Sequence, residues 1–526
     1  MPNYIGITIG PIYKTLMKAK KTRELFAASY IFSYIMKCII KDIAFRDSTF
    51  IIPYFDKSKL NEKFGIGIFP DRMIFETSEG DFEYLQQVIE DILQKISSDL
   101  LNHTKGRLKE HLSIHKANIQ EKRDFYSSVT PKNISEYLNN YFKVYFCEIE
   151  CVGNFKEVNL KLNKYLDTLE LQEKYISEET CDYLADFFYY VNHSFIMKDA
   201  FETKQVFPSI PEIAMHELNL PKSFLKFDDD SKIYDNVESE VKNFKQYHKY
   251  IAIICADADS MTETIKNLNE NNDFLNLSSV LYEFAKRANE KIKKNGGVTI
   301  YAGGDDLFFF APIVSKNISV IQLIDDLKEI FKDLIEEKLG ERKVKPTLSF
   351  GLSISYYKYP MNEALEISNS LLYLAKSMKE RWDSEPDKKK KNSLAFRVLK
   401  HSGKSYEGCF YFKSQEYSEL KNILCGTNTV NLPEKTINSL IYKLSLHKTM
   451  LINIGSNKAR LESFFENNFN EEIHKDTKLY INQICDFTYE IMVSKYYNDK
   501  NNENNDLRIE YICSVLRLLN FLQGGN

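Results

Sequence analysis

Short apolar runs alternate with helical stripes over residues 250–400 of the chain. Runs typical of buried strands occupy five segments: 250–256, 298–302, 307–311, 347–355 and 393–400. Helical sequence fills the intervals between them, at 261–294, 321–339 and 361–379. The order strand, helix, hairpin, helix, strand predicts a ferredoxin-like sheet with helices covering one face.

Outside that region the pattern is mainly helical. Residues 154–245 are helical in tendency and rich in tyrosine, phenylalanine and lysine. After about residue 403, apolar residues recur at helical spacing in two stripes: Ile437, Leu440, Ile441, Leu444 and Leu451, then Ile509, Ile512, Leu516 and Leu519. Such stripes predict the core of a small helical bundle.

The predicted hairpin turns through Gly303-Gly304-Asp305-Asp306. Two glycines allow positive φ and a close approach of a ligand to the backbone, and the adjacent carboxylates supply the hard oxygen ligands that Mg²⁺ prefers. The same tetrapeptide also fits an ordinary hairpin turn. The turn therefore needs a second acidic element before it indicates a metal site.

A second acidic element stands upstream, where the strand 250–256 runs directly into Asp257-Ala258-Asp259-Ser260. Two-metal phosphoryl transfer needs carboxylates from separate elements that converge near one point. We predict that Asp257, Asp305 and Asp306 are the catalytic residues and bind the metal ions.

Two neighbouring signals stay open. Asp259 and Ser260 could contact a nucleotide, but they fit the cap of the following helix about as well. Lys376 lies beside the apolar stripe of the helix 361–379 and could point its ammonium group at a phosphate near the strand ends. A lysine in that position is also typical of a solvated helix face. No residue stands out as a general base.

Composition narrows the class of protein. The chain has 526 residues, which predicts three or four domains, and its 43% hydrophobic and 27% charged residues are typical neither of a disordered nor of a membrane protein. The net charge is only −4, so any contact with RNA must come from local patches or partner subunits.

The nine cysteines, without a Cys-x-x-Cys pair or a secretory leader, indicate a reducing cytoplasm. Cys147 and Cys151 are closely spaced but fall in a strand-like run, so we read them as core or strand cysteines and expect no zinc. No segment approaches the length of a membrane span.

Several motifs together resemble the catalytic palm of the large subunit of type III CRISPR effector complexes. They are Ala256–Met261, Tyr301–Asp306, Leu348–Gly351, Tyr357–Pro360 and Ala375-Lys376. The start of the chain is similar to the first, degenerate palm of the Cmr, or type III-B, branch of that family. The segments that carry this likeness are Ile9–Pro11, Lys21–Leu25, Ala28–Tyr30 and Pro70–Arg72, and Phe207–Ala214 resembles a segment between the two palms.

The resemblance implies an α+β multidomain fold with two ferredoxin-like palm domains and helical middle and C-terminal domains. We place a degenerate first palm with a helical insertion at 1–153 and a mainly helical middle domain at 154–245. The catalytic palm follows at 246–402, and a C-terminal helical bundle at 403–526.

The resemblance also implies an activity. In such complexes the large subunit is a palm-type nucleotidyltransferase, which joins ATP molecules into cyclic oligoadenylate messengers when target RNA binds, or attaches adenylate to another small molecule. Asp257, Asp305 and Asp306 would bind Mg²⁺ or Mn²⁺. The nucleotide contacts would be Asp259, Ser260, Gly303, Gly304, Ser349 near the base and Lys376 at the triphosphate. The implied partners are the other Cmr-type subunits and, through the complex, the guide RNA and the target RNA.

The chain departs from the family pattern at several places. It starts directly at the first palm and has no His-Asp dipeptide, so we expect neither the HD nuclease domain of many relatives nor DNA cleavage. Ala258 and Ala28 stand where glycine is usual.

The first palm also differs chemically from the second. No Asp or Glu occurs between Met1 and Arg23, whereas Lys14, Lys18 and Lys21 recur at the spacing of one helical face. We therefore expect an inactive half that only binds, through the phosphate of a second nucleotide or an RNA backbone. A solvated helix face explains the lysines about as well.

Two other functions remain open. The chain could be a non-catalytic scaffold of the same complex, although it keeps every candidate metal ligand. It could also be a stand-alone enzyme like the diguanylate cyclases, which share the palm and a Gly-Gly-acid-acid turn. Two features argue against the cyclase: Leu307 replaces the usual aromatic residue after the acids, and a second palm is present.

Overall fold

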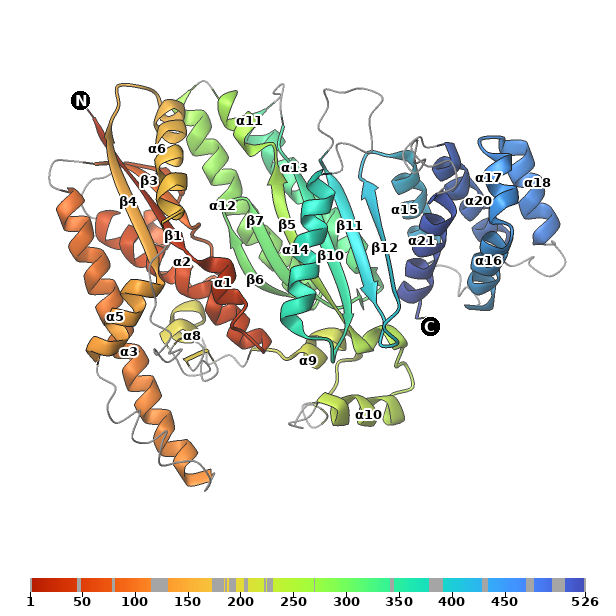
Figure 1. Cartoon of the computed structure of the whole chain (residues 1–526), viewed down its shortest axis with the longest axis horizontal. Coiled ribbons are helices and arrows are strands. Elements are labelled where there is room, and N and C mark those ends of the chain that lie inside the picture. Colours follow the sequence, from red (N-terminus) through yellow and green to blue (C-terminus); the bar gives the residue numbers. More distant parts are fainter. Residues whose placement is uncertain are drawn as a thin grey trace.

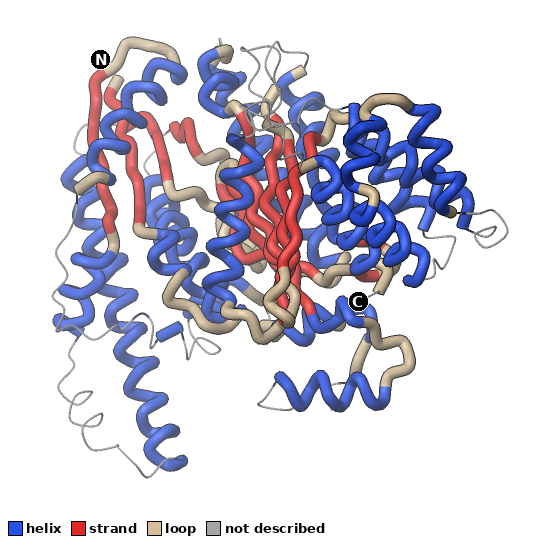
Figure 2. The backbone as a smooth tube through the Cα atoms, turned by 45° about the vertical axis from the view of Figure 1, so that its right-hand side comes forward, coloured by secondary structure: helices blue, strands red, loops and turns tan. Residues whose placement is uncertain are grey.

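The computed structural model contains two large β-sheets packed against helices, followed by a group of helices at the C-terminal end (Figure 1). The structure describes residues 2–44, 49–77, 81–114, 131–172, 184, 187–188, 195–202, 207–221, 224, 230–268, 270–340, 345–377, 391–427, 434–469, 477–493 and 507–524. The strands of the second sheet gather at the centre of the molecule, with helices on both sides (Figure 2).

The first sheet has four strands. They are β1 (Asn3–Gly10), β2 (Thr49–Ile52), β3 (Arg72–Thr77) and β4 (Lys143–Glu150), in the order β2-β3-β1-β4 with antiparallel neighbours. The helices of this part are α1 (Ile12–Leu16), α2 (Thr22–Ala44), the short 3-10 helix η1 (Lys57–Lys59), α3 (Asp81–Ile114), α5 (Pro131–Tyr141) and α6 (Phe155–Glu170). The first and third strands lie at the centre, which is the ferredoxin-like arrangement.

The second sheet has six strands. They are β5 (Tyr250–Asp259), β6 (Val298–Gly303), β7 (Asp306–Ala311), β10 (Thr347–Tyr356), β11 (Ser393–Leu399) and β12 (Ser405–Tyr411), in the order β12-β11-β10-β5-β7-β6. Its helices are α11 (Met261–Lys266), α12 (Asn271–Lys294), α13 (Val320–Leu339) and α14 (Met361–Ser377), and β8 (Val314–Ser315) and β9 (Ile318–Ser319) form a small ribbon.

Four consecutive strands of the second sheet, β10-β5-β7-β6, repeat the strand order of the first. We call the two units the first palm and the second palm. The predicted fold class, an α+β chain with two ferredoxin-like palms and additional helical parts, is confirmed. The helical run expected at 261–294 is broken into α11 and α12, and Leu268 is fully buried between them.

Helices cover both faces of the second sheet, and not one face as the pattern predicted. The pair α12 and α13 packs on one face. On the other, α14 crosses β10 so closely that a Cβ at Gly351 would lie 2.1 Å from the carbonyl oxygen of Ser368. An apolar stripe shows that a helix has a buried side but does not say which face of a sheet it meets.

Two predicted domain boundaries cut through packed units. The boundary at residue 153 falls before α6, yet α6 packs on β1 and β4 of the first palm. The boundary at residue 402 falls inside the antiparallel hairpin of β11 and β12, so the helical C-terminal part begins only after β12. The division into four domains itself stays a prediction.

The remaining helices lie between the palms and at the C-terminal end. Between the palms are α8 (Phe195–Ala200), α9 (Ile210–Ala214), η3 (His216–Leu218), α10 (Asp230–Glu240) and η4 (Gln246–Lys249). The C-terminal helices are α15 (Gln415–Thr427), α16 (Glu434–Leu446), α17 (Lys448–Ile454), α18 (Lys458–Asn468), α20 (Lys478–Val493) and α21 (Arg508–Leu522). The hydroxyl of Tyr511 on α21 donates to the carbonyl oxygen of Cys409 at 3.0 Å, which fastens this group to β12.

Candidate active site

The three predicted metal ligands lie together at one end of the second sheet. Asp257, near the end of β5, stands directly opposite Asp306, the first residue of β7. The backbone N–H of Ala258 donates to the carbonyl oxygen of Asp305 at 3.1 Å, which ties the hairpin turn to the end of β5. The fold therefore brings together the two acidic elements that stand far apart in the sequence.

Both glycines of the turn meet a physical requirement. Gly304 has a φ of +63°, which L side chains rarely adopt. A Cβ at Gly303 would lie 2.7 Å from the hydroxyl oxygen of Tyr301, so any side chain there would displace that ring. Backbone conformation and the space available thus explain why glycine occupies both positions. Their contact with a nucleotide stays a prediction.

Lys376 reaches the same end of the sheet from α14. Its ammonium group forms an ion pair with the carboxylate of Asp257 and lies 3.4 Å from the carbonyl oxygen of Ala258. The side chain is thus held at the site and is not directed into solvent. Its predicted contact with a triphosphate is untested, but its position agrees with that role.

The carboxylates of the hairpin are electrostatically unfavourable as they stand. Burial, together with the charge of Asp257, raises the pKa of Asp305 to about 6. Burial, followed by the charges of Asp305 and Asp257, raises the pKa of Asp306 far above its usual range, although this residue is exposed at the start of β7. Carboxylates that repel one another at a place open to ions are stabilised by a bound cation.

The donor chemistry of this group fits a hard divalent cation, because all three side chains offer carboxylate oxygens. In the described part of the chain, no three acidic, histidine or cysteine side chains already converge as a ready-made metal site. The carboxylate of Asp257 is instead paired with Lys376 on α14.

Asp259 and Ser349 are buried and hydrogen-bonded to each other. The Ser349 hydroxyl donates to the Asp259 carboxylate at 2.8 Å, and Thr347 donates at the same distance. The backbone N–H of Asn392 also donates to Asp259, at 2.8 Å, which joins the end of β5 to the start of β11. Burial raises the pKa of Asp259. Their assignment as nucleotide contacts stays a prediction that these internal partners do not favour.

Ser260 begins α11, but its side chain does not cap the helix. It has a φ of +58°, and its carbonyl oxygen accepts from the N–H of Thr264 at 2.8 Å. The alternative in which Asp259 serves as the cap also fails, because that carboxylate is held by β10 and β11. Whether Ser260 contacts a nucleotide is untested.

The first palm places a different set of side chains at the equivalent positions. Thr8 and Arg72 form the last pair between β1 and β3, as Asp257 and Asp306 form the last pair between β5 and β7. In both palms the pairing with the fourth strand continues two residues further, to Gly10 in the first and to Asp259 in the second. Asp71 therefore corresponds to Asp305. The first palm has a hydroxyl, one carboxylate and a guanidinium where the second has three carboxylates.

Acidic side chains on α6 neutralise the guanidinium of Arg72 in the first palm. Arg72 donates to Asp167 at 2.7 Å and to Glu170 at 2.9 Å, and the Thr8 hydroxyl also donates to Glu170. A cation already fills this position, which agrees with the expected loss of metal chemistry in the first palm. Asp71 lies beyond the carboxylate-free stretch that ends at Arg23, so the sequence did not predict an acidic residue at this position.

The predicted lysine face does not exist as one helical surface. The helix α1 ends at Leu16, and the chain turns before α2 begins at Thr22. Lys14 therefore lies on α1, while Lys18 and Lys21 lie in the turn. The ammonium group of Lys18 stands 5.3 Å from the ring centroid of Tyr141.

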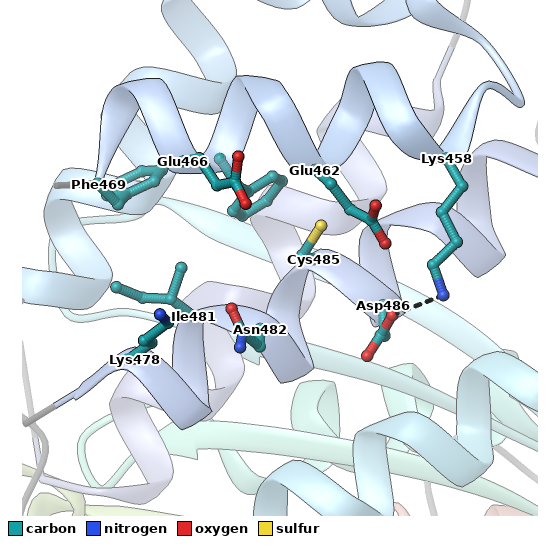
Figure 3. A pocket seen from close by; sticks show the side chains of 10 residues that line it. Lys458, Glu462, Glu466, Phe469, Lys478, Ile481, Asn482, Cys485 and Asp486 are labelled. Atoms are coloured by element: carbon teal, nitrogen blue, oxygen red, sulfur yellow. Dashed lines mark ion pairs between the residues drawn. The ribbon is translucent and has the colours of Figure 1, made fainter. Parts of the chain in front are cut away.

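Two cavities lie away from the acids. One of about 550 Å³ separates α18 from α20 and is lined by charged side chains, among which Lys458 and Asp486 form an ion pair at 3.1 Å (Figure 3). Another of about 220 Å³ lies between the palms beside Lys293 and Thr299. Neither is lined by a predicted site residue.

Cys147 lies on β4, and Cys151 follows that strand in a buried position. Both are free thiols. Of the helices that the structure describes, none combines the length and apolar character needed to cross a bilayer.

Two protein-family models match the chain. The one described as Cas10/Cmr2, second palm domain, matches residues 250–384, and the one described as CRISPR-associated protein Cmr2, N-terminal, matches residues 4–109. A curated relative, the CRISPR system Cmr subunit Cmr2 of Pyrococcus furiosus, is 33% identical over 130 residues. That match covers 25% of this chain and only 13% of the relative's length.

Solved structures share the fold at low sequence identity. The cryo-EM structure of type III-B Cmr-beta in the apo state gives a TM-score of 0.54 at 12% identity and covers 86% of this chain and 75% of that chain. Cmr-beta bound to cognate target RNA gives 0.53 at 11% identity and covers 99% and 83%. A Csm1–Csm4 cassette in complex with pppApA gives 0.50 at 11% identity and covers 100% and 69%.

The family matches fall on the two palms separately, one on each, and the solved relatives share the arrangement of both. The acidic hairpin lies within the segment matched by the second-palm model, and the Thr8–Arg72 pair lies within the segment matched by the N-terminal model. On these findings residues 250–384 match the second palm of Cas10/Cmr2, residues 4–109 match the N-terminal part of Cmr2, and the chain shares its fold with the type III-B Cmr-beta structure.

Proposed function

We propose that the second palm is the catalytic half of a metal-dependent nucleotidyltransferase that uses ATP. The observation that carries the proposal is the meeting of Asp257 with Asp305 and Asp306 at one sheet end, with Lys376 beside them. This arrangement lies in a palm that matches the Cas10/Cmr2 second-palm model. Mutually repelling carboxylates and one lysine are what the binding of a metal–triphosphate group requires.

The acidic residues and the lysine would have different roles because of their opposite charges. Asp257, Asp305 and Asp306 would hold Mg²⁺ or Mn²⁺, which when bound neutralises phosphate charge. Lys376, which pairs with Asp257 in the structure, would face the triphosphate. In the reaction a hydroxyl oxygen of the acceptor attacks the α-phosphorus of ATP. The new O–P bond forms, the bond to pyrophosphate breaks, and the hydroxyl proton leaves to solvent.

Relatives of the same fold suggest the substrate class. Csm1–Csm4 cassettes have been solved in complex with pppApA and with cA4. By analogy we propose that the product here is an adenylate second messenger, either a cyclic oligoadenylate or a conjugate of adenylate with another small molecule.

We further propose that the chain works inside a type III-B effector complex in the cytoplasm. Its partners there would be the other Cmr-type subunits, the guide RNA and the target RNA. The support is the shared fold with Cmr-beta, which has been solved bound to cognate target RNA. Binding of target RNA would be the signal that starts synthesis.

The test is mass spectrometry of products formed from ATP by the reconstituted complex with Mg²⁺ and target RNA. The wild-type complex should form an adenylate product, and the Asp305→Ala/Asp306→Ala variant should lose at least about 100-fold in rate because transition-state charge is no longer stabilised. Asp333→Ala, which removes an exposed carboxylate on α13, is the control and should retain activity.

Other outcomes select the alternative functions. A wild-type complex that assembles on target RNA but leaves ATP untouched with varied co-substrates would be a scaffold. Formation of a cyclic dinucleotide from GTP by the chain alone would instead identify a cyclase of the diguanylate type.

A further inference from the structure

The first palm lays a loop against the catalytic hairpin of the second. The backbone N–H of Ala302 on β6 donates to the carbonyl oxygen of Gly67 at 3.3 Å. A Cβ at Gly304 would lie 3.5 Å from the Cβ of Pro70. Pro70 and Gly304 occupy equivalent positions in the two palms, so the two hairpins meet about a local pseudo-twofold axis.

This contact fixes the residue that follows Pro70. The carbonyl oxygen of Asp71 accepts from the N–H of Ile9 at 2.9 Å, which anchors Asp71 to the end of β1. The hydrogen bonds that the structure gives the Arg72 guanidinium go to α6, and Arg72 acts on Asp71 through its charge, which lowers the pKa of Asp71 against the larger effect of burial. The Asp71 carboxylate is thus held near the palm–palm contact without a bonded cation from its neighbour.

Asp71 lies within electrostatic reach of the catalytic acids. Its charge contributes to the raised pKa of both Asp305 and Asp306, and to that of Tyr301 in the same hairpin. Burial raises the pKa of Asp71 itself. The electrostatics agree with the backbone contacts, which bring the loop before β3 to the tip of the hairpin.

Building on the proposed function, we propose that Asp71 is a fourth acidic residue of the second palm's site, supplied by the first palm. It acts as a positioning residue, because its charge strengthens the hold of the site on divalent cations. The degenerate palm would then contribute to metal binding in its active neighbour, although it has lost the acids that would form a site of its own.

The physical reason is the range of charge interactions in a partly buried place. A carboxylate close to a cation adds attraction even without touching it, and less so at high salt. Replacing Asp71 by the neutral, nearly isosteric Asn should weaken divalent-cation binding by about three- to tenfold. Without metal, the same change removes a repulsion, so the variant should unfold at the same or a higher temperature than the wild type.

The experiment measures Mn²⁺ binding to the full chain by electron paramagnetic resonance of the free ion at low ionic strength. It compares wild type with Asp71→Asn, Asp71→Glu and the Asp305→Ala/Asp306→Ala variant, with thermal unfolding of each in the absence of metal. Glu148→Gln, which removes an exposed carboxylate on β4, controls for net charge. Asp71→Asn should bind Mn²⁺ more weakly, while Asp71→Glu and Glu148→Gln should stay near the wild-type value.

Each other result decides against a specific claim. Equal Mn²⁺ affinity of Asp71→Asn and wild type overturns the role of Asp71 while leaving the proposed catalytic site intact. Equal weakening in Asp71→Glu and Asp71→Asn, or a lowered unfolding temperature of Asp71→Asn, shows a structural role in place of a charge effect. If wild type and the Asp305→Ala/Asp306→Ala variant bind Mn²⁺ alike, the metal site of the proposed function fails and this inference falls with it.

Discussion

At the scale of single residues, the two palms differ in charge at several equivalent positions. In the second, the carboxylate of Asp257 meets the ammonium group of Lys376 on the helix that follows the fourth strand. In the first, the hydroxyl of Thr8 meets the carboxylate of Glu170 on the corresponding helix. One backbone arrangement therefore supports an acidic strand end in one palm and, in the other, an arginine paired with acidic side chains.

We predict that the charged form of Asp305 lowers the free energy of unfolding, and that this effect depends on pH. Because its pKa is raised to about 6, the folded chain binds this proton more tightly than the unfolded chain, so stability falls as pH rises from about 4 to 6. Asp305→Asn removes the cost and should raise the free energy of unfolding without metal by about 1–2 kcal/mol at pH 8, after allowance for solvent screening.

Denaturant unfolding between pH 5 and 8 checks this, with Asp333→Asn as the exposed control. The gain should shrink toward the acid end, and adding Mg²⁺ should stabilise wild type more than Asp305→Asn. A variant that is less stable than wild type at pH 8 would contradict the prediction.

At the scale of elements, the close crossing of α14 over β10 determines where Lys376 lies. The Ser368 hydroxyl on α14 donates to the carbonyl oxygen of Gly351 at 2.9 Å and accepts from the N–H of Cys255 at 3.1 Å. Lys376 lies about two turns further along the same helix. A small displacement of α14 therefore moves the ammonium group away from Asp257.

Gly351→Ala should disrupt this crossing. The new Cβ would meet the backbone of α14, 2.1 Å from the oxygen of Ser368 and 2.3 Å from the nitrogen of Leu372, and backbone cannot turn aside as a side chain can. We expect a loss of about 3 kcal/mol in the free energy of unfolding and lower activity of the assembled complex.

Gly6→Ala is a suitable comparison in the first palm. Its Cβ would lie 3.2 Å from a methyl group of Leu162, which can rotate, so the loss should stay below about 1 kcal/mol. Denaturant unfolding of both variants measures the difference. Equal losses would show that the contact with α14 is no tighter than an ordinary packing contact.

Much of the element order could be predicted from sequence, because strands and hairpin carry strong local patterns. The same holds for the meeting of Asp257 with the acidic hairpin, since both lie at strand ends of one compact unit. The strand β12 escaped prediction because its half-exposed, glycine-containing sequence gives a weak signal. The position of Asp71 could not be read from the sequence, because it depends on a contact with Gly304 made by a distant part of the chain.

At the scale of the whole molecule, the C-terminal helices are joined to the second palm through a polar junction. Asp325 on α13 pairs with Lys328 at 3.0 Å and with Lys421 on α15 at 3.5 Å. Close by, at the start of α15, Glu416 is buried, and one of its carboxylate oxygens has no hydrogen-bond partner among the described residues. A buried carboxylate of this kind weakens the junction when it is charged.

We predict from Glu416 that the stability of this junction depends on pH. Burial raises its pKa to about 7, so the folded chain favours the neutral acid and stability falls as pH rises from about 4.5 to 7. Glu416→Gln should stabilise the chain by about 1–3 kcal/mol at pH 8 and by little at pH 5.

Thermal unfolding of the full chain at the two pH values tests this, with Glu419→Gln on the same helix as the control. A gain that is independent of pH would assign the effect to packing and not to charge.

The contact of Pro70 with Gly304 also bears on how such a molecule can change over time. In a symmetric dimer of two identical palms, every substitution occurs twice. Replacing the residue equivalent to Asp306 by arginine would then remove an acidic residue from both halves at once. Here the two halves belong to one chain, and each position can vary alone. Fusion thus lets one half lose its acidic residues while it keeps the contact with the other half.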